Sequence, residues 1–170
     1  TEPKLVKRGN PLANVNGVLN ALKIETDQLQ SLFLEGEGAG GKATASSIIS
    51  DLYEIYLNSN FPSLGYRINQ LKNFENLDIS NNISSFYLRI MVKDIAGVLA
   101  KITSNLNDEG ISIETILQIP EKDVSKNKIP IIIVTHETTR KILLKALVKI
   151  EELDFVFGKI AMITIDKTEN

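Results

Sequence analysis

The chain has 170 residues, of which 43% are hydrophobic and 24% charged, so it can bury a sizeable core as one or two domains. Its formal net charge of −2 and its lack of a basic run exclude the electrostatic signature of a nucleic-acid-binding or membrane-surface protein. The absence of cysteine excludes a disulfide framework, a thiolate nucleophile and a cysteine-ligated metal. There is neither an apolar run of about 18 residues nor a charged-then-apolar leader. We therefore expect a soluble, cytoplasmic protein.

Residues 1–57 predict only a few small elements. A short strand over 4–6 runs into a Gly-Asn-Pro turn signal at 9–11. Residues 18–24 alternate in polarity and residues 29–34 are apolar, which together predict an antiparallel hairpin. Two or three strands and one helix cannot cover their own apolar faces. We expect this part to pack against another copy of itself or against a second domain.

Four glycines fall within residues 36–41, where neither a helix nor a strand gains from them. A glycine turn allows the backbone to approach a ligand or another segment closely, and Thr44 is then the predicted N-cap of a helix that begins at Ala45. The alternative is a tight strand-to-helix connection with no ligand. The P-loop pattern fails because Lys42 is followed by Ala43, and the glycine spacing G-x-G-x-G-G is not the dinucleotide fingerprint.

Several short motifs in the first 57 residues occur together and in order. They are NPLA at 10–13, V-N-G-V at 15–18, N-A at 20–21, the glycine turn, T-A-S at 44–46 and D-L at 51–52. In this order and spacing they resemble the end of the catalytic region of homoserine dehydrogenase. Glu37 departs from the pattern, since that family usually has a small residue or proline there.

The resemblance implies reversible NAD(P)-dependent hydride transfer between L-aspartate 4-semialdehyde and L-homoserine, on the route to threonine and methionine. It also implies that the glycine turn lies near the nicotinamide end of the cofactor. The candidate cofactor-binding residues are Gly38, Ala39, Gly40 and Thr44. The Rossmann domain, the substrate carboxylates and the proton-donating lysine of the family are expected upstream of Thr1, in missing domains of the same chain. We therefore expect no catalytic residue here, no bound cofactor, and no activity from this chain alone.

Residues 58–85 change in character, because they are rich in asparagine and serine and their apolar residues follow no sustained period. This composition predicts a loosely docked linker, with one weak helix or turn within residues 64–74.

Residues 86–166 alternate between strand and helix patterns in the order βαββαβ. The predicted strands are 86–92, 111–119, 129–135 and 156–165, and the predicted helices begin at Val98 and at Thr138. Right-handed crossovers then give an α+β, ferredoxin-like fold, a four-stranded antiparallel sheet with both helices on one face. The other face, with Ile131, Ile133 or their neighbours exposed, is expected to pair with another copy.

The run KDIAGVL at 93–99 and the run GISIE at 110–114 resemble the two ligand-binding segments of an ACT domain, a small regulatory module that binds amino acids. Ala96 replaces the proline of the usual D-x-P-G turn. The helix N-terminus after Gly97 presents free N–H groups to a ligand carboxylate, and Asp94 can meet the ligand's ammonium group. The candidate effector-binding residues are Asp94, Ile95, Ala96, Gly97, Val98 and Leu99, with Ser112, Ile113 and Glu114 from a partner subunit.

The resemblance thus divides the chain into the end of a homoserine dehydrogenase catalytic domain (1–57), a linker (58–85) and an ACT regulatory domain (86–166). Its expected effector is L-threonine, its expected assembly is at least a homodimer through the ACT domains, and no metal is expected. Two alternatives stay open: an isolated amino-acid-binding module, and the ACT part of another enzyme of the pathway, such as an aspartate kinase. His136 is the only histidine and has no second ligand or nucleophile beside it in the sequence, so we read it as structural rather than catalytic.

Overall fold

The computed structural model describes residues 2–57, 66–73, 78–118 and 128–167. The chain forms two compact units, and each is considered by itself. The first, here called the sheet unit, consists of Thr1–Lys7 together with Leu77–Asn170. The second, here called the hairpin unit, is Arg8–Asn76.

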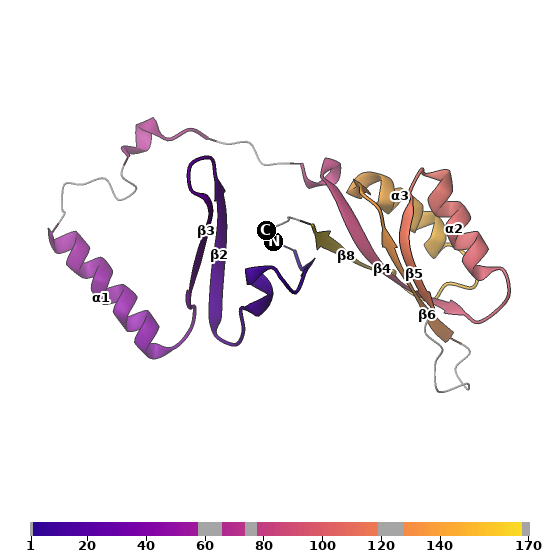
Figure 1. Cartoon of the computed structure of the whole chain (residues 1–170), viewed down its shortest axis with the longest axis horizontal. Coiled ribbons are helices and arrows are strands. Elements are labelled where there is room, and N and C mark those ends of the chain that lie inside the picture. Colours follow the sequence, from indigo (N-terminus) through magenta and orange to yellow (C-terminus); the bar gives the residue numbers. More distant parts are fainter. Residues whose placement is uncertain (1, 58–65, 74–77, 119–127, 168–170) are drawn as a thin grey trace. The chain divides into compact units, whose positions relative to one another are not determined.

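The sheet unit contains an antiparallel sheet in the strand order β8-β4-β6-β5, with α2 and α3 on one side of it (Figure 1). Its elements follow in chain order as β4 (Ile83–Lys93), α2 (Val98–Asp108), β5 (Ile113–Gln118), β6 (Lys128–Thr135), α3 (Arg140–Glu151) and β8 (Ala161–Asp166). The predicted βαββαβ order and the predicted α+β fold are confirmed. A two-residue strand, β7 (Thr138–Thr139), pairs with the start of β4 and leads into α3.

The core of the sheet unit lies between the sheet and the two helices. Alternate residues of β4 and β6 face the helices, because side chains along a strand point to opposite sides with a period of two. The helices contribute residues three or four positions apart, which lie on one helical face. The buried apolar side chains are Phe86, Leu88, Ile90, Val92, Val98, Ile102, Leu106, Ile111, Ile129, Ile131, Ile133, Leu143, Ala146, Leu147 and Ile150.

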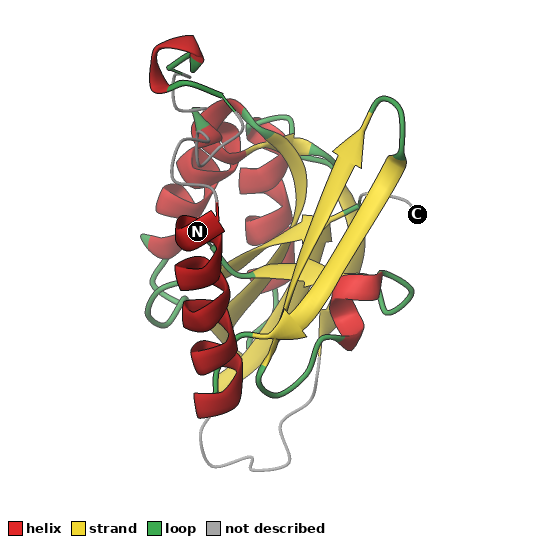
Figure 2. Ribbon diagram, turned by 90° about the vertical axis from the view of Figure 1, so that its left-hand side faces the viewer, coloured by secondary structure: helices red, strands yellow, loops and turns green. Residues whose placement is uncertain are grey.

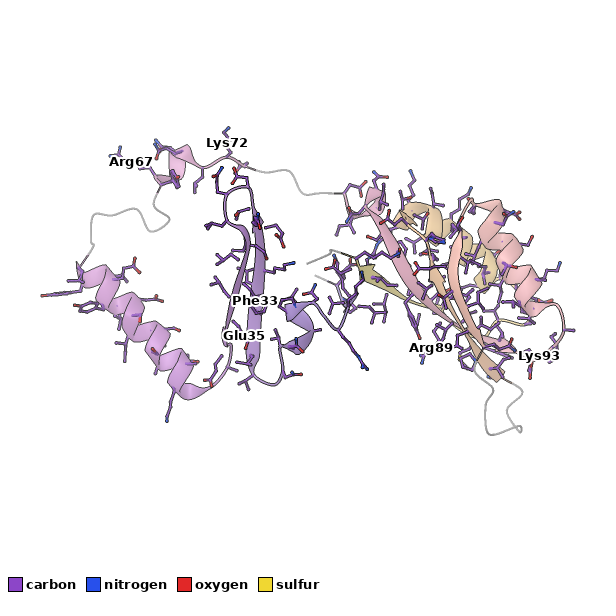
Figure 3. The ribbon with its side chains drawn as sticks, in the orientation of Figure 1. Phe33, Glu35, Arg67, Lys72, Arg89 and Lys93 are labelled. Carbon is purple, nitrogen blue, oxygen red and sulfur yellow. The ribbon has the colours of Figure 1, made fainter. Side chains whose placement is uncertain are left out.

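The expectation that Ile131 or Ile133 is exposed is wrong, and their neighbours on the other face of β6 are half-buried and not exposed. Ile131 and Ile133 are 1% and 0% exposed and belong to the core under the helices. Ile132 and Val134, which alternate with them along β6, are only half-buried and lie on the face without helices. Arg89 projects from β4 on that same open face (Figure 3). Periodicity shows that the two sets of β6 side chains lie on opposite faces, but not which set the helices cover.

A strand from the start of the chain extends this sheet. β1 (Lys4–Val6) pairs in parallel with β8, with Lys4 opposite Thr164 and Val6 opposite Asp166. The strand predicted over 4–6 is present, but it belongs to the sheet unit and not with the residues that follow it. The physical reason is that β8 would otherwise leave its backbone N–H and C=O groups unpaired along one edge.

The hairpin unit is built on the predicted antiparallel pair, β2 (Leu19–Thr26) and β3 (Gln30–Glu37), which Figure 2 shows as two long strands joined by a short turn. A short 3-10 turn, η1 (Pro11–Asn14), precedes the hairpin, and α1 (Gly41–Leu57) follows it. No side chain of α1 is buried, although the helix carries many apolar residues. The exposed apolar side chains of α1 are Ile48, Ile49, Leu52, Tyr53, Ile55, Tyr56 and Leu57.

The predicted linker over 58–85 is only partly within the described residues. Short 3-10 turns occur at η2 (Ile68–Gln70) and η3 (Ile79–Asn81), and the first lies within the segment where a weak helix is predicted. β4 begins at Ile83, three residues before the predicted strand, because Ile83 and Ser84 pair with β7. The boundary between the two compact units, near residue 76, lies inside the predicted linker. The division into three domains stays a prediction.

Candidate functional site

The loop between β4 and α2 is shaped by one glycine. Gly97 is the N-cap of α2 and has φ +87°, a left-handed conformation that residues with a Cβ rarely adopt. Its carbonyl accepts the first helical hydrogen bond from the backbone N–H of Lys101, at 3.0 Å. No side chain caps this end of the helix, and its first turn contains no acidic residue. The first N–H groups of α2 and the positive end of its dipole are thus available to an anion.

A cavity of about 640 Å³ opens beside this loop, entirely within the sheet unit. All six residues predicted for the effector loop line it, and residues from β5, β6 and the next turn of α2 complete it. The lining residues are Val92, Lys93, Asp94, Ile95, Ala96, Gly97, Val98, Leu99, Ala100, Thr103, Gln118, Ile129 and Ile131. The cavity is large enough for a small molecule of the size of an amino acid.

The chemistry of this cavity is mixed. Val92, Val98 and Ile131 are buried side chains that form an apolar part of its wall. Asp94 and Gln118 are exposed and supply a carboxylate and an amide. Together with the free N–H groups of α2, these groups suit a zwitterion: the carboxylate of an amino acid at the helix N-terminus, its ammonium group at Asp94, and its side chain against the apolar wall.

The other predicted effector segment lies elsewhere on the same protomer. None of Ser112, Ile113 and Glu114 lines the cavity. The carbonyl of Ser112 accepts a hydrogen bond from the backbone N–H of His136 at 2.9 Å, and the Glu114 carboxylate pairs with the ammonium of Lys167 at 2.8 Å. The hydrogen bond from Lys167 lowers the pKa of Glu114 below its usual value. Their contribution from a partner subunit stays a prediction.

Gln118 is a lining residue that the sequence did not single out. It lies at the far end of β5 from Ile113, and its register places it opposite Ile131 on β6, next to the cavity. That register contains a shift between Ile113 and Thr115, so counting along the strand does not reveal which residues face the cavity. Thr103 was also missed, although it lies one helical turn after Leu99 and its hydroxyl donates to the Leu99 carbonyl at 3.0 Å.

The glycine turn of the hairpin unit has two distinct causes. A Cβ on Gly38 would lie 1.5 Å from the Asn20 side-chain nitrogen, so a larger residue there would require the exposed Asn20 side chain to move. Gly40 has φ +118°, and a Cβ there would meet nothing within 4 Å, so this glycine is required by the backbone conformation before α1. Ala39 is exposed between them.

The predicted capping role of Thr44 is wrong. The helix already begins at Gly41, and the backbone N–H of Thr44 donates to the Gly40 carbonyl at 3.0 Å as an ordinary helical bond. The Thr44 hydroxyl donates to the same carbonyl, also at 3.0 Å. Threonine favours both N-caps and this backward bond inside a helix, and the sequence alone does not distinguish them. Whether Gly38, Ala39, Gly40 and Thr44 bind a cofactor stays a prediction.

Within the described residues, no group of three or more histidine, aspartate or glutamate side chains is placed to hold a metal ion. Among the helices of those same residues, none is long and apolar enough to cross a membrane.

Comparison with known proteins matches both halves of the chain to named families. Residues 1–53 match the family model described as homoserine dehydrogenase, and residues 86–152 match the ACT domain. A homoserine dehydrogenase of Pseudomonas aeruginosa is 33% identical over 97% of this chain and 39% of its own length, and one of Helicobacter pylori is 33% identical over 96% and 38%. The crystal structure of a homoserine dehydrogenase from Thiobacillus denitrificans superposes with a TM-score of 0.82 at 32% identity, over 97% of this chain and 38% of that one.

These matches confirm the resemblance to homoserine dehydrogenase. The chain spans about 39% of the length of the curated relatives it matches. The homoserine dehydrogenase match at 1–53 includes β1 of the sheet unit as well as the hairpin and most of α1. The ACT match at 86–152 includes the whole Asp94–Leu99 loop beside the cavity and ends before β8. Both sets of candidate site residues therefore lie within matched segments.

Proposed function

We propose that this chain is a regulatory portion of a homoserine dehydrogenase. The complete enzyme interconverts L-homoserine and L-aspartate 4-semialdehyde with NAD(P), in the biosynthesis of threonine and methionine. The relatives at 33% identity support this proposal. The chain spans only 38–39% of their length, which is consistent with nucleotide-binding and catalytic groups that lie outside it. We expect the isolated chain to have no dehydrogenase activity. Oxidation of homoserine by the isolated chain, measured as NADPH formation, would contradict this division.

The regulatory role is carried by the cavity beside the Asp94–Leu99 loop. Its open helix N-terminus, its exposed carboxylate and its apolar wall complement the three parts of an amino acid within one protomer. L-threonine is the proposed effector, since a product of the pathway is the natural signal for feedback. Binding regulates only if the effector prefers one of two states of the enzyme, so binding and inhibition have to be measured separately.

Calorimetric titration of the chain with L-threonine, L-methionine and L-isoleucine tests the effector site. Asp94→Asn removes the charge that would meet the ligand's ammonium group but keeps the size of the side chain, and should weaken binding roughly 10- to 100-fold. Asp154→Asn is the matched control, because Asp154 is exposed and does not line the cavity. Saturable heat that is lost only in the Asp94 variant supports the proposal. No heat with any of the three amino acids refutes the effector role.

A second role, self-association, is favoured by the apolar surfaces that the chain leaves uncovered. The open face of the sheet unit carries the half-buried Ile132 and Val134, and α1 carries seven exposed apolar side chains. Contiguous exposed apolar surface is typical of protein–protein interfaces. We expect at least a dimer, and sedimentation equilibrium of the chain at micromolar concentration measures it. A monomer at all concentrations would leave these surfaces to the missing domains of the same polypeptide.

We propose fewer cofactor-contacting residues in the glycine turn than the four that the resemblance implies. The space beside Gly38 is occupied by the exposed Asn20 side chain, which would have to move before a ligand could approach this glycine. Gly40 and the start of α1 remain open, and a helix N-terminus suits a cofactor phosphate or carboxamide oxygen. In the complete enzyme, NAD(P) supplies the hydride acceptor or donor, and the contribution proposed for this chain is backbone contact at Ala39 and Gly40.

A further inference from the structure

Glu2, just before β1, makes polar contacts with the rest of the sheet unit that neither proposed role explains. Three groups from separate parts of the chain meet here: Glu2 before β1, Arg140 at the first position of α3, and Thr164 on β8. The Arg140 guanidinium forms an ion pair with the Glu2 carboxylate and donates to the Thr164 hydroxyl at 3.0 Å. The Thr164 hydroxyl donates in turn to the Glu2 carboxylate at 3.4 Å.

This arrangement is partly shielded from water. The side chains of Arg140 and Glu2 are 23% and 28% exposed, and Thr164 is only 5% exposed. An ion pair in such a place is screened less by salt than a pair on the open surface. The contact between Glu2 and Arg140 joins residues 138 positions apart, so it constrains the chain far more than a local pair does.

The position of Arg140 is otherwise unfavourable. A cation at the first position of a helix lies at the positive end of the helix dipole, and the first turn of α3 has no acidic residue of its own. The Glu2 carboxylate supplies the missing negative charge from outside the helix. Arg140 also donates to Thr164, but Glu2 is the partner that neutralises its charge, so we call the pair of Glu2 and Arg140 the lock of the segment that carries β1.

A very short segment joins β1 to the first element of the hairpin unit. Only Lys7, Arg8 and Gly9 separate the end of β1 from Asn10, the N-cap of η1 in the hairpin unit. The Asn10 side chain accepts from the backbone N–H of Leu12 at 3.0 Å, and its carbonyl accepts from that of Ala13 at 2.9 Å. The covalent connection between the docked strand and η1 is therefore only three residues long.

We propose that Glu2 and β1 form a coupling strand, docked on β8 by the lock with Arg140 and Thr164, through which the sheet unit controls the order of η1 in the hairpin unit. On the other side of β8 lies β4, which pairs with it from Ser85 to Arg89 and leads directly into the Asp94–Leu99 loop. Backbone hydrogen bonds thus connect the cavity loop to the coupling strand through the pairing of β4 with β8 and the pairing of β8 with β1. The sheet unit is attached to the hairpin unit at residue 7 as well as at residue 77.

NMR-detected amide hydrogen exchange on the whole 170-residue chain, without any effector, tests the coupling. Glu2→Lys places two cations together at the start of α3 and should undock the strand. We expect about fivefold faster exchange at the β8 amides of residues 164–166, and a similar increase at Leu12 and Ala13, which belong to the hairpin unit. The double variant Glu2→Lys with Arg140→Glu reverses the pair and should restore both rates.

Glu109→Lys is the matched control, because it breaks ion pairs with Lys145 and Lys149 in the same unit but away from β1. It should leave the exchange of Leu12 and Ala13 unchanged. Faster exchange at β8 alone would show that the lock is only a local contact and would overturn the coupling. No change at either place, or a Glu109→Lys effect equal to that of Glu2→Lys at η1, would overturn it too. Failure of the effector proposal is read separately, from the heat of threonine binding.

Discussion

Replacement of Gly97 by alanine tests whether the cavity loop depends on a left-handed backbone. Gly97 has φ +87° and ψ −11°, and a Cβ added there would meet nothing within 4 Å. The substitution therefore adds no steric clash with the surroundings. Its cost comes only from forcing a residue with a Cβ into a conformation that glycine alone adopts readily.

The size of the effect follows from two opposing terms. The left-handed conformation costs a non-glycine residue about 1–2 kcal/mol. Replacing glycine by alanine also removes conformational freedom from the unfolded chain, which returns about 0.4–1 kcal/mol. The net loss in the free energy of unfolding is then about 1 kcal/mol, or roughly 4–8 °C in the Tm of a unit of this size. Gly97→Asn should lose less, because asparagine tolerates this region of φ and ψ better than alanine.

Urea unfolding followed by circular dichroism measures these differences, and threonine calorimetry on the same variants reports whether the loop keeps its shape. Gly41→Ala is the control, since Gly41 is the first residue of α1, lacks a positive φ and has open space around it. A Gly97→Ala variant as stable as the original chain, or no more perturbed than Gly41→Ala, would refute the argument that this loop requires glycine.

Two further predictions concern the core and the surface of the sheet unit. Leu88 lies on β4, the strand between β8 and β6, and its side chain is fully buried. Leu88→Ala should therefore cost about 3 kcal/mol of unfolding free energy in the same urea assay, whereas Leu144→Ala, at a site 45% exposed, should cost less than about 1 kcal/mol. Equal losses would contradict the assignment of the core. Hydrogen bonds from Lys145 and Lys149 lower the pKa of Glu109, so its contribution to stability is complete above the unfolded pKa of about 4.3 and is lost as pH falls through the lower folded pKa. Glu109→Gln should therefore flatten the acid side of a plot of unfolding free energy against pH, and an unchanged slope below pH 5 would exclude this role.

The sequence predicted the sheet unit well, because its local patterns agree with its fold. The alternation over 86–92 and the apolar stripe that begins at Val98 gave strands and helices close to those observed. The glycine of the Asp94–Leu99 loop was placed correctly as well, and all six residues of that loop line the cavity. These features are encoded within a few residues of one another, where the period of polarity and the choice of turn residue act directly.

The candidate site was predicted less completely. Gln118 reaches the cavity because a register shift in β5 sets its face, and Thr44 lies inside a helix that begins three residues before it. The space beside Gly38 is occupied by the side chain of Asn20, which lies across the hairpin. In each case the residue type suits two local structures equally well, and a neighbour distant in the sequence decides between them.

The amino-acid sequence by itself determined the βαββαβ order and the resemblance that the comparisons confirm, but it placed the start of the last strand at 156 where β8 begins at Ala161. Only the tertiary structure decided that Ile131 and Ile133 lie under the helices, that Ser112–Glu114 lie apart from the cavity of their own protomer, and that β1 pairs with β8. The physical reason is that β1 and β8 are more than 150 residues apart, and that pairing depends on an unsatisfied strand edge and on the Glu2–Arg140 lock. A three-residue strand carries no local pattern that names its partner.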